Sequence, residues 1–365
     1  MTDKVVLSAL AKGAAKERLD REEALSIAKL GTPDDLHLLG EAAFRNRSKR
    51  FGENATYVVN QHINPSNICE GECGFCRYSA RVGTNEGYVL EQEEILQKLE
   101  AAAPTEVHIV GGMNRIWDFA KSLELVRSIR ALRPDIHIKA YTAVEIDWFA
   151  RLEEVSPVRI LQLFKDAGLD GLPGGGAELF SARMRKKYCP EKIGPDQWLE
   201  IHHQAHNLGI VTNATMLYGI GESSEERVDH LLALRDAQDA TGGFSCFIPL
   251  AYQAAPGDQA QRQLYPGENL AVIALARLVL DNFDHIKAYW PMIGLETTSA
   301  GLSFGADDID GTVGGERIAH AAGAKTPEEV TRDKMRETIR LGGFVPRERD
   351  GRFREIGQRG GGGGR

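Results

Sequence analysis

The sequence has few cysteines, few aromatic residues and no long apolar run. Among 365 residues there are five cysteines, and aromatic residues make up 7%. An odd number of cysteines, three of them within eight residues, argues against a secreted disulfide framework and suggests a metal site. The apolar stretch at residues 270–276 stops at Arg277, far short of the ~20 residues that a membrane span requires.

An excess of basic charge is also lacking. Lysine and arginine number 44 against 52 acidic residues, a net charge of −8. This balance argues against a protein whose main work is binding nucleic acid, and says nothing against small-molecule chemistry. The apolar residues before Lys12 are too few for a signal peptide. We therefore expect a cytoplasmic globular protein without a nucleic-acid or membrane partner.

Short β-rich segments alternate with helical patterns after about 50 mainly helical residues. Six strand–helix units in series predict the α/β class, with a parallel sheet and right-handed crossovers. A closed or partly closed TIM-like barrel places function at the carboxyl ends of the strands, where glycine-rich turns lie. A doubly wound open sheet is the alternative. The expected strands are residues 56–63, 106–110, 137–142, 169–172, 210–218 and 244–250.

The segment CEGECGFC carries Cys69, Cys73 and Cys76 with three and two residues between them. Three thiolates on one loop suit a soft metal centre, whereas structural zinc sites take four ligands, usually as two separated pairs. A 4Fe–4S cluster on three cysteines leaves one iron open for a substrate, unlike the fully ligated cluster of an electron carrier. The alternatives are three unrelated cysteines or a non-catalytic metal protein.

This spacing, with Phe75 before the last cysteine, resembles the radical S-adenosylmethionine (SAM) superfamily. The resemblance implies a partial (βα)6 barrel in which the open iron binds SAM. It also implies that an electron from the cluster cleaves SAM to a 5′-deoxyadenosyl radical. The electron would come from a donor such as flavodoxin or ferredoxin.

Further stretches narrow the resemblance. HIVGG (108–112), PGGGAE (173–178) and NATMLYG (213–219) are similar to aminofutalosine synthases of menaquinone biosynthesis. That family adds the 5′-deoxyadenosyl radical to 3-[(1-carboxyvinyl)oxy]benzoate and forms 6-amino-6-deoxyfutalosine, with SAM as co-substrate. A radical SAM cyclase of the cyclic dehypoxanthinylfutalosine synthase type is the alternative. The resemblance implies a barrel core at 53–323 between a helical segment at 1–52 and a C-terminal helix and extension at 324–358, followed by a disordered glycine-rich tail at 359–365.

Glycines and polar residues at the strand ends are the candidate SAM-binding residues. Gly111 and Gly112 allow a close backbone approach, or form an ordinary turn. Glu145 binds a ribose or a cation, or pairs at a helix start. The glycines before Ala177 are expected to open a helix whose N-terminus binds a carboxylate. The candidates are Gly111, Gly112, Thr142, Glu145, Gly174, Gly175, Gly176 and Asn213; no catalytic acid or base is assigned.

Other polar residues have a functional and an ordinary structural interpretation. Asn213 and Thr215 alternate on one strand and are expected to face the barrel interior. His62 contacts the cluster or SAM, or is structural. Histidines 202, 203 and 206 are expected on a solvated helix face rather than at zinc. Aspartates 307, 308 and 310 close the barrel or orient a ligand.

Four positions depart from the aminofutalosine synthase pattern. They are Arg77, Asn114, Ile220 and the segment 254–258, all at expected strand ends. The departures leave the predicted barrel and cluster unaffected, but they leave the exact substrate open.

Overall fold

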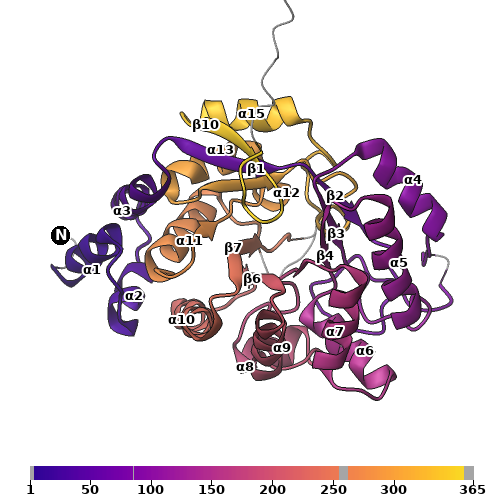
Figure 1. Ribbon diagram of the computed structural model, residues 1–365. Helices are drawn as coiled ribbons and strands as arrows, with labels where there is room; N and C mark the ends of the chain where they lie inside the picture. The colour runs from indigo at the N-terminus through magenta and orange to yellow at the C-terminus, as the bar shows by residue number, and fades with distance from the viewer. Residues whose placement is uncertain (1–3, 85, 255–261, 357–365) are drawn as a thin grey trace, which may run out of the picture.

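Three helices precede the first strand, and the computed structural model describes residues 4–84, 86–254 and 262–356. The helices are α1 (Lys4–Ala15), α2 (Arg21–Ala28) and α3 (Pro33–Phe51). Capping boxes begin two of them: Asp20 with Glu23 at α2, and Thr32 with Asp35 at α3. Figure 1 shows these helices grouped at one side of the molecule, with α3 beside α11 (Pro266–Val279).

A curled sheet of seven parallel strands forms a half-barrel at the centre of the molecule. The strands follow one another in sequence order, and helices cover the outer face (Figure 1). The predicted α/β barrel is therefore confirmed. The strands are β2 (Asn60–Ile63), β3 (Glu106–Ile109), β4 (His137–Ala140), β5 (Gly171–Leu172), β6 (Val211–Tyr218), β7 (Phe244–Ala251) and β8 (His285–Ile286).

The outer helices alternate with these strands. Their ends follow ordinary signals: Ser223 and Glu226 form a capping box at α10, and Gly242 ends that helix in a left-handed conformation. The helices are α4 (Gln92–Ala102), α5 (Phe119–Leu132), α6 (Ala143–Leu152), α7 (Pro157–Ala167), α8 (Ala182–Tyr188), α9 (Pro195–Asn207) and α10 (Ser224–Thr241). None of the helices in the described ranges is long and apolar enough to cross a bilayer.

The prediction of six strands was wrong in two respects. The expected first strand, 56–63, is two strands: β1 (Asn54–Val58) lies in a second sheet, and β2 starts the barrel. The chain bends at Val59, where hydrogen bonds to Thr105 and Glu106 begin the pairing with β3. The seventh strand, β8, was missed because its two residues are too short to show an alternation.

The second sheet is parallel and three-stranded, in the order β10–β1–β9. Strand β9 (Asp308–Gly311) follows the short helices α12 (Trp290–Ile293) and α13 (Leu295–Gly301) and the 3-10 turn at Leu302–Phe304. Strand β10 (Val345–Arg349) follows α14 (Ile318–Ala322) and α15 (Arg332–Leu341). The C-terminal segment thus covers the first strand. The division into the four predicted segments stays a prediction, and the tail 359–365 lies outside the described residues.

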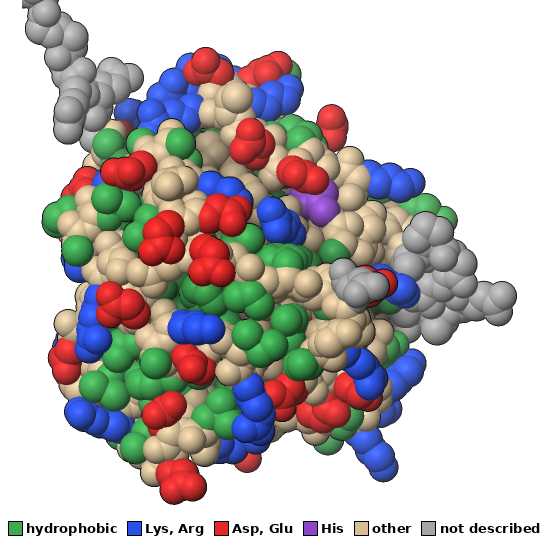
Figure 2. Space-filling view, turned by 90° about the vertical axis from the view of Figure 1, so that its right-hand side faces the viewer, with side chains coloured by type: hydrophobic (Ala, Val, Ile, Leu, Met, Phe, Trp, Pro, Cys, Tyr) green, Lys and Arg blue, Asp and Glu red, His purple; other side chains and the backbone are tan. Residues whose placement is uncertain are grey.

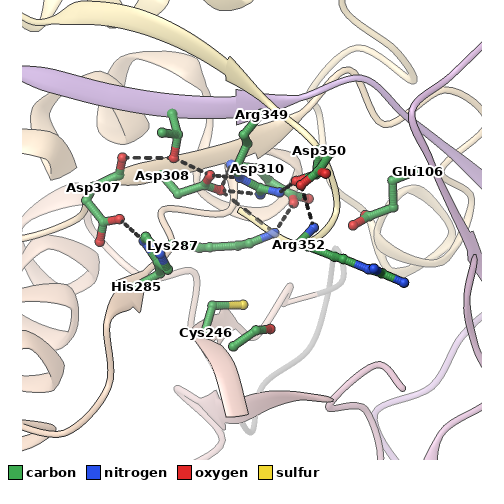
Figure 3. A network of polar contacts seen from close by, with 12 residues as sticks. Glu106, Cys246, His285, Lys287, Asp307, Asp308, Asp310, Arg349, Asp350 and Arg352 are labelled. Carbon is green, nitrogen blue, oxygen red and sulfur yellow. Dashed lines mark hydrogen bonds and ion pairs between the residues drawn. The ribbon is translucent and has the colours of Figure 1, made fainter. Parts of the chain in front are cut away.

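Buried ion pairs hold each sheet together, and one at Lys287 joins the second sheet to the barrel (Figure 3). The Arg349 guanidinium contacts both carboxylate oxygens of Asp308, at 2.5 and 3.0 Å, and Thr56 donates to the same carboxylate at 2.6 Å. Lys287 lies 2.5 Å from Asp310, and a separate pair joins Lys139 to Glu106 at 2.9 Å. The Asp310 contact with Lys287 closes the barrel against the second sheet, and a ligand-orienting role for Asp310, which lines the cavity, stays a prediction.

Candidate active site

One cavity of about 330 Å³ occupies the half-barrel at the carboxyl ends of its strands. Its lining includes Cys69, Cys73 and Cys76. The structure brings every candidate SAM-binding residue into the same lining, although binding by them stays a prediction. Those residues are Gly111, Gly112, Thr142, Glu145, Gly174, Gly175, Gly176 and Asn213.

On the side of the molecule that Figure 2 shows, neither acidic nor basic side chains dominate the surface. Acidic and basic side chains alternate there around a central group of apolar side chains. This face matches the modest net charge of −8. It offers no continuous basic stripe of the kind that follows a nucleic-acid backbone.

The cysteine loop follows β2 directly and is held by backbone hydrogen bonds. The N–H of Cys69 donates to Ala80, and that of Glu70 donates to Met113 at 2.8 Å. The N–H of Gly74 donates to Tyr188 at 2.7 Å. These bonds fix the loop against the turn after β3 and the end of α8, so its conformation does not depend on the thiols alone.

The donor set and the packing of the loop fit a cluster. A Cβ on Gly112 would lie 3.0 Å from the Cys69 sulfur, so only glycine leaves the space beside that sulfur. Burial raises the pKa of Cys69, and it raises that of Cys73 to about 12. Cluster binding would therefore release protons from these thiols.

A site for a single metal ion needs a different arrangement of ligands from a cluster site. Within the described ranges, no three His, Cys, Asp or Glu side chains converge to hold one metal ion. A 4Fe–4S cube takes each thiolate at a different corner, so the three cysteines need only border one space, as they do. Cys189 and Cys246 are buried and lie outside the lining.

Glu145 organises the glycine turn after β3. Its Oε1 accepts the N–H groups of Gly111 and Gly112 at 2.7 and 3.0 Å, and its Oε2 accepts the N–H and Oγ1–H of Thr142 at 2.8 Å. Thr142 caps α6 in return. The structure contains the predicted pairing at a helix start, and binding of a ribose or a cation by Glu145 stays a prediction. Burial raises the pKa of this carboxyl, and its four donors oppose that shift.

The glycine loop after β5 does not open a helix, so that prediction was wrong. Residues 177–180 are irregular, and α8 starts only at Ala182 after the cap Ser181. Gly176 and Glu178 both have positive φ, which breaks a helical path. Glu178 pairs with the half-buried Lys192 at 2.6 Å, so it does not complement a helix dipole.

The loop packs closely on its neighbours and leaves no room for side chains. A Cβ on Gly174 would lie 2.6 Å from the Asn213 carbonyl oxygen, and one on Gly176 would lie 2.4 Å from Val144. Thr215 donates to the Gly174 carbonyl at 2.6 Å. Asn213 and Thr215 both line the cavity, which confirms that they face the interior.

The histidines on α9 do not form a solvated face, so that prediction was also wrong. His202 is fully buried between Trp198 and Phe244, and its Nδ1 shares a hydrogen bond of 2.8 Å with Thr212. His206 contacts the same hydroxyl at 2.8 Å. The helix packs Trp198 and His202, one turn apart, onto β6 and β7 rather than toward water.

Several cavity residues were not predicted from the sequence as site residues. His108, Lys139, Lys192, Tyr289 and Glu316 all line the space with His62. His108 and Lys139 lie within short strands, where alternation alone could have indicated an inward direction. Tyr289 follows the strand that sequence patterns missed.

The positions that depart from the family pattern fall in different places. Arg77 and Tyr78 line the cavity, and Arg77 has no ion-pair partner in the described part of the chain. The Asn114 side-chain oxygen accepts the N–H groups of Ile116 and Trp117 and so serves its own loop. Ile220 is buried outside the lining, and residues 255–258 lie outside the described ranges.

Comparisons with known proteins agree with this site. A family model described as the Radical SAM superfamily matches residues 63–234, and one described as the CofH/MqnC C-terminal region matches residues 241–359. Together with the relatives below, these matches show that the chain belongs to the radical SAM superfamily. It is a radical SAM enzyme, whose family implies a 4Fe–4S cluster and SAM.

The similar relatives confirm the narrower resemblance. The aminodeoxyfutalosine synthase of Thermus thermophilus is 40% identical over 331 residues, covering 88% of this chain and 89% of the relative. That of Streptomyces coelicolor is 37% identical, with 92% and 90% covered. A 5-amino-6-(D-ribitylamino)uracil–L-tyrosine 4-hydroxyphenyl transferase of Methanospirillum hungatei is 38% identical, with 87% and 89% covered.

A solved structure supports the fold alone. The crystal structure of methylornithine synthase (PylB) matches with a TM-score of 0.74 at 18% identity, covering 93% of this chain and 97% of that one. At this identity the likeness concerns the barrel and its extension, not the substrate.

Proposed function

We propose that the chain forms 6-amino-6-deoxyfutalosine from SAM and 3-[(1-carboxyvinyl)oxy]benzoate, a step of menaquinone biosynthesis. The observation that carries the proposal is a single cavity that encloses three cysteines and the glycine turns, in a chain 40% identical to an aminodeoxyfutalosine synthase over most of both lengths. We place the reaction in the cytoplasm, with flavodoxin or ferredoxin as reductant.

Cys69, Cys73 and Cys76 would hold the cluster, which when bound supplies the electron that cleaves SAM. The other residues position and shield the reactants. Gly111 and Gly112, fixed by Glu145, let the ligand approach the backbone closely. The apolar walls exclude water and fit an aromatic ring, which protects a radical from side reactions. These walls include Val110, Leu217, Ile248, Leu250 and Met292.

The test is anaerobic turnover of the reconstituted enzyme with reductant, SAM and the enol-ether benzoate, followed by mass spectrometry. We expect 6-amino-6-deoxyfutalosine from the wild type and none from Cys69→Ala. Cys189→Ala is the matched control, because this buried thiol lies outside the cavity and its loss should leave product formation intact.

Other products would contradict the proposal in recognisable ways. Formation of 5′-deoxyadenosine alone rejects the substrate. Deuterium transfer from dehypoxanthinylfutalosine into 5′-deoxyadenosine identifies the cyclase instead. Transfer of a hydroxyphenyl group from tyrosine to 5-amino-6-(D-ribitylamino)uracil identifies the activity named for the relative from Methanospirillum hungatei.

A further inference from the structure

Three polar side chains form one row across neighbouring strands of the barrel. His62 on β2 is in register with His108 on β3, and His108 is in register with Lys139 on β4. All three line the cavity, and the two imidazole rings lie 4.6 Å apart. Residues in register on adjacent strands share a face, so the row is a continuous polar strip on one wall.

The strip lies deeper in the barrel than the cysteines. Gly111, three residues after His108, is at the turn near the Cys69 loop. Three residues of strand correspond to about 10 Å. A ligand reaching from the cysteine loop to the strip would therefore be about as long as a substituted benzoate with its side chain.

The polar groups at this depth can donate hydrogen bonds. The buried Nε2 of His62 has no hydrogen-bond partner, His108 lines the same cavity, and Tyr289 shares Asp310 and Glu316 with His62 as charged neighbours. Lys139 uses one of its three N–H donors on Glu106. A ligand that supplies acceptors would satisfy this set.

The carboxylates near the strip are already paired. Asp310 lies 2.5 Å from Lys287, and Glu316 contacts His320 and the N–H of Ala319, both at 2.9 Å. None of them is left to bind a cationic ligand. The anionic charge in the wall is therefore offset before any ligand enters.

The charges around the two imidazoles keep them neutral in the free protein. Burial lowers the pKa of His62, and Lys139 on β4 adds to that shift against Glu316, Asp310 and Glu106. Burial, His62 and Lys139 together hold the pKa of His108 well below its usual range. An anion placed against the pair would raise both pKa values and so favour uptake of a proton.

We infer that His62, His108 and Tyr289 form a carboxylate subsite at the inner end of the cavity, which binds the ring carboxylate of an aromatic acid. This inference rests on the proposed function, because it assigns one end of that substrate. It orients the ring carboxylate inward and the enol ether toward the cysteine loop.

The experiment compares two ligands of nearly the same shape. The reconstituted enzyme without reductant is titrated by calorimetry with the enol-ether benzoate and with its ring carboxamide analogue. A hydrogen bond to a charged group contributes ~1.5–3 kcal/mol, so the acid should bind about 10- to 100-fold more tightly than the amide. In two buffers of different ionisation enthalpy, acid binding should show proton uptake and amide binding should not.

Two variants test the named side chains. Tyr289→Phe and His108→Gln should weaken binding of the acid about tenfold or more and change that of the amide about twofold or less. Tyr265→Phe, at an exposed residue outside the cavity, is the control and should change neither. Equal binding of acid and amide by the wild type overturns the inference, as does an equal loss of both ligands in the variants.

The experiments distinguish failure of the carboxylate subsite from failure of the proposed function. A wild-type enzyme that makes 6-amino-6-deoxyfutalosine without distinguishing acid from amide rejects the subsite alone. An enzyme that distinguishes them but yields another product keeps the carboxylate subsite and rejects the proposed reaction.

Discussion

Gly112 has no Cβ, and the absence of that atom leaves space beside the Cys69 sulfur. Its φ is +78°, and an added Cβ would lie 3.0 Å from that sulfur. We expect Gly112→Ala to lower the iron content after reconstitution and to reduce 5′-deoxyadenosine formation at least tenfold. Iron analysis and chromatography of the products measure both effects.

Gly83 provides the matched control for that substitution. Its φ of +82° is nearly the same, but a Cβ there would meet nothing within 4 Å. Gly83→Ala therefore carries the backbone strain, ~1 kcal/mol, without the contact. If both variants lose iron equally, strain in the chain rather than crowding at the sulfur is the cause.

Individual residues were predictable from sequence where the signal is local. The three cysteines lie within eight residues, and the glycines at 111–112 and 174–176 are contiguous. All of these residues line the cavity. His108, Lys139 and Tyr289 depend on strand register and on the position of β8, which short segments do not reveal. The irregular path at Glu178 depends on a positive φ at a non-glycine residue, which composition does not indicate.

At the scale of elements, His230 connects α10 to the glycine loop and to β6. Its Nδ1 accepts the N–H of Phe180 at 3.1 Å, and its Nε2–H donates to the Thr215 carbonyl at 2.9 Å. Burial lowers the pKa of His230 to about 3. The imidazole is therefore neutral in the folded protein and gains a proton near pH 6.5 when the chain unfolds.

The sign of the resulting pH dependence follows from that lowered pKa. The unfolded chain binds more protons between pH 6.5 and 3, so stability falls as the pH is lowered through this range. We expect His230 to contribute about 2 kcal/mol less at pH 5 than at pH 7. Urea unfolding of the wild type and His230→Gln should show their difference in unfolding free energy narrowing by that amount; a constant difference contradicts the assignment.

Elements were predictable where their ends carry explicit signals. The capping boxes at Asp20, Thr32 and Ser223, which are readable from the sequence, each begin a helix. The break at Val59 carried no such signal, because no glycine or proline interrupts the stretch from Asn54 to Ile63. Only the pairing partners, β9 and β10 on one side and β3 on the other, separate the two strands.

At the scale of the whole molecule, Arg349 joins β10 to β9 across β1 within the second sheet. Arg349 and Asp308 are both buried and paired at 2.5 Å. Arg349→Met leaves the carboxylate without its main cation, and breaking one side of a buried pair costs ~3–5 kcal/mol. Denaturant unfolding should show this loss, and the double variant with Asp308→Asn should recover part of it.

Arg347 on the same strand is the control for that prediction. Its pair with Glu355 is exposed on both sides, so Arg347→Met should cost no more than ~1 kcal/mol. Similar losses for Arg347→Met and Arg349→Met would show that β10 itself, rather than the buried pair, determines the effect.

The strand order of the second sheet has a consequence for synthesis of this protein on the ribosome. Strand β1 ends at Val58, but its neighbour β10 begins only at Val345. A ribosome adding about 5–20 residues per second needs roughly 15–60 s to make the intervening chain. During that interval the edge of β1 that pairs with β10 is unpaired, and the second sheet cannot be completed until translation is nearly finished.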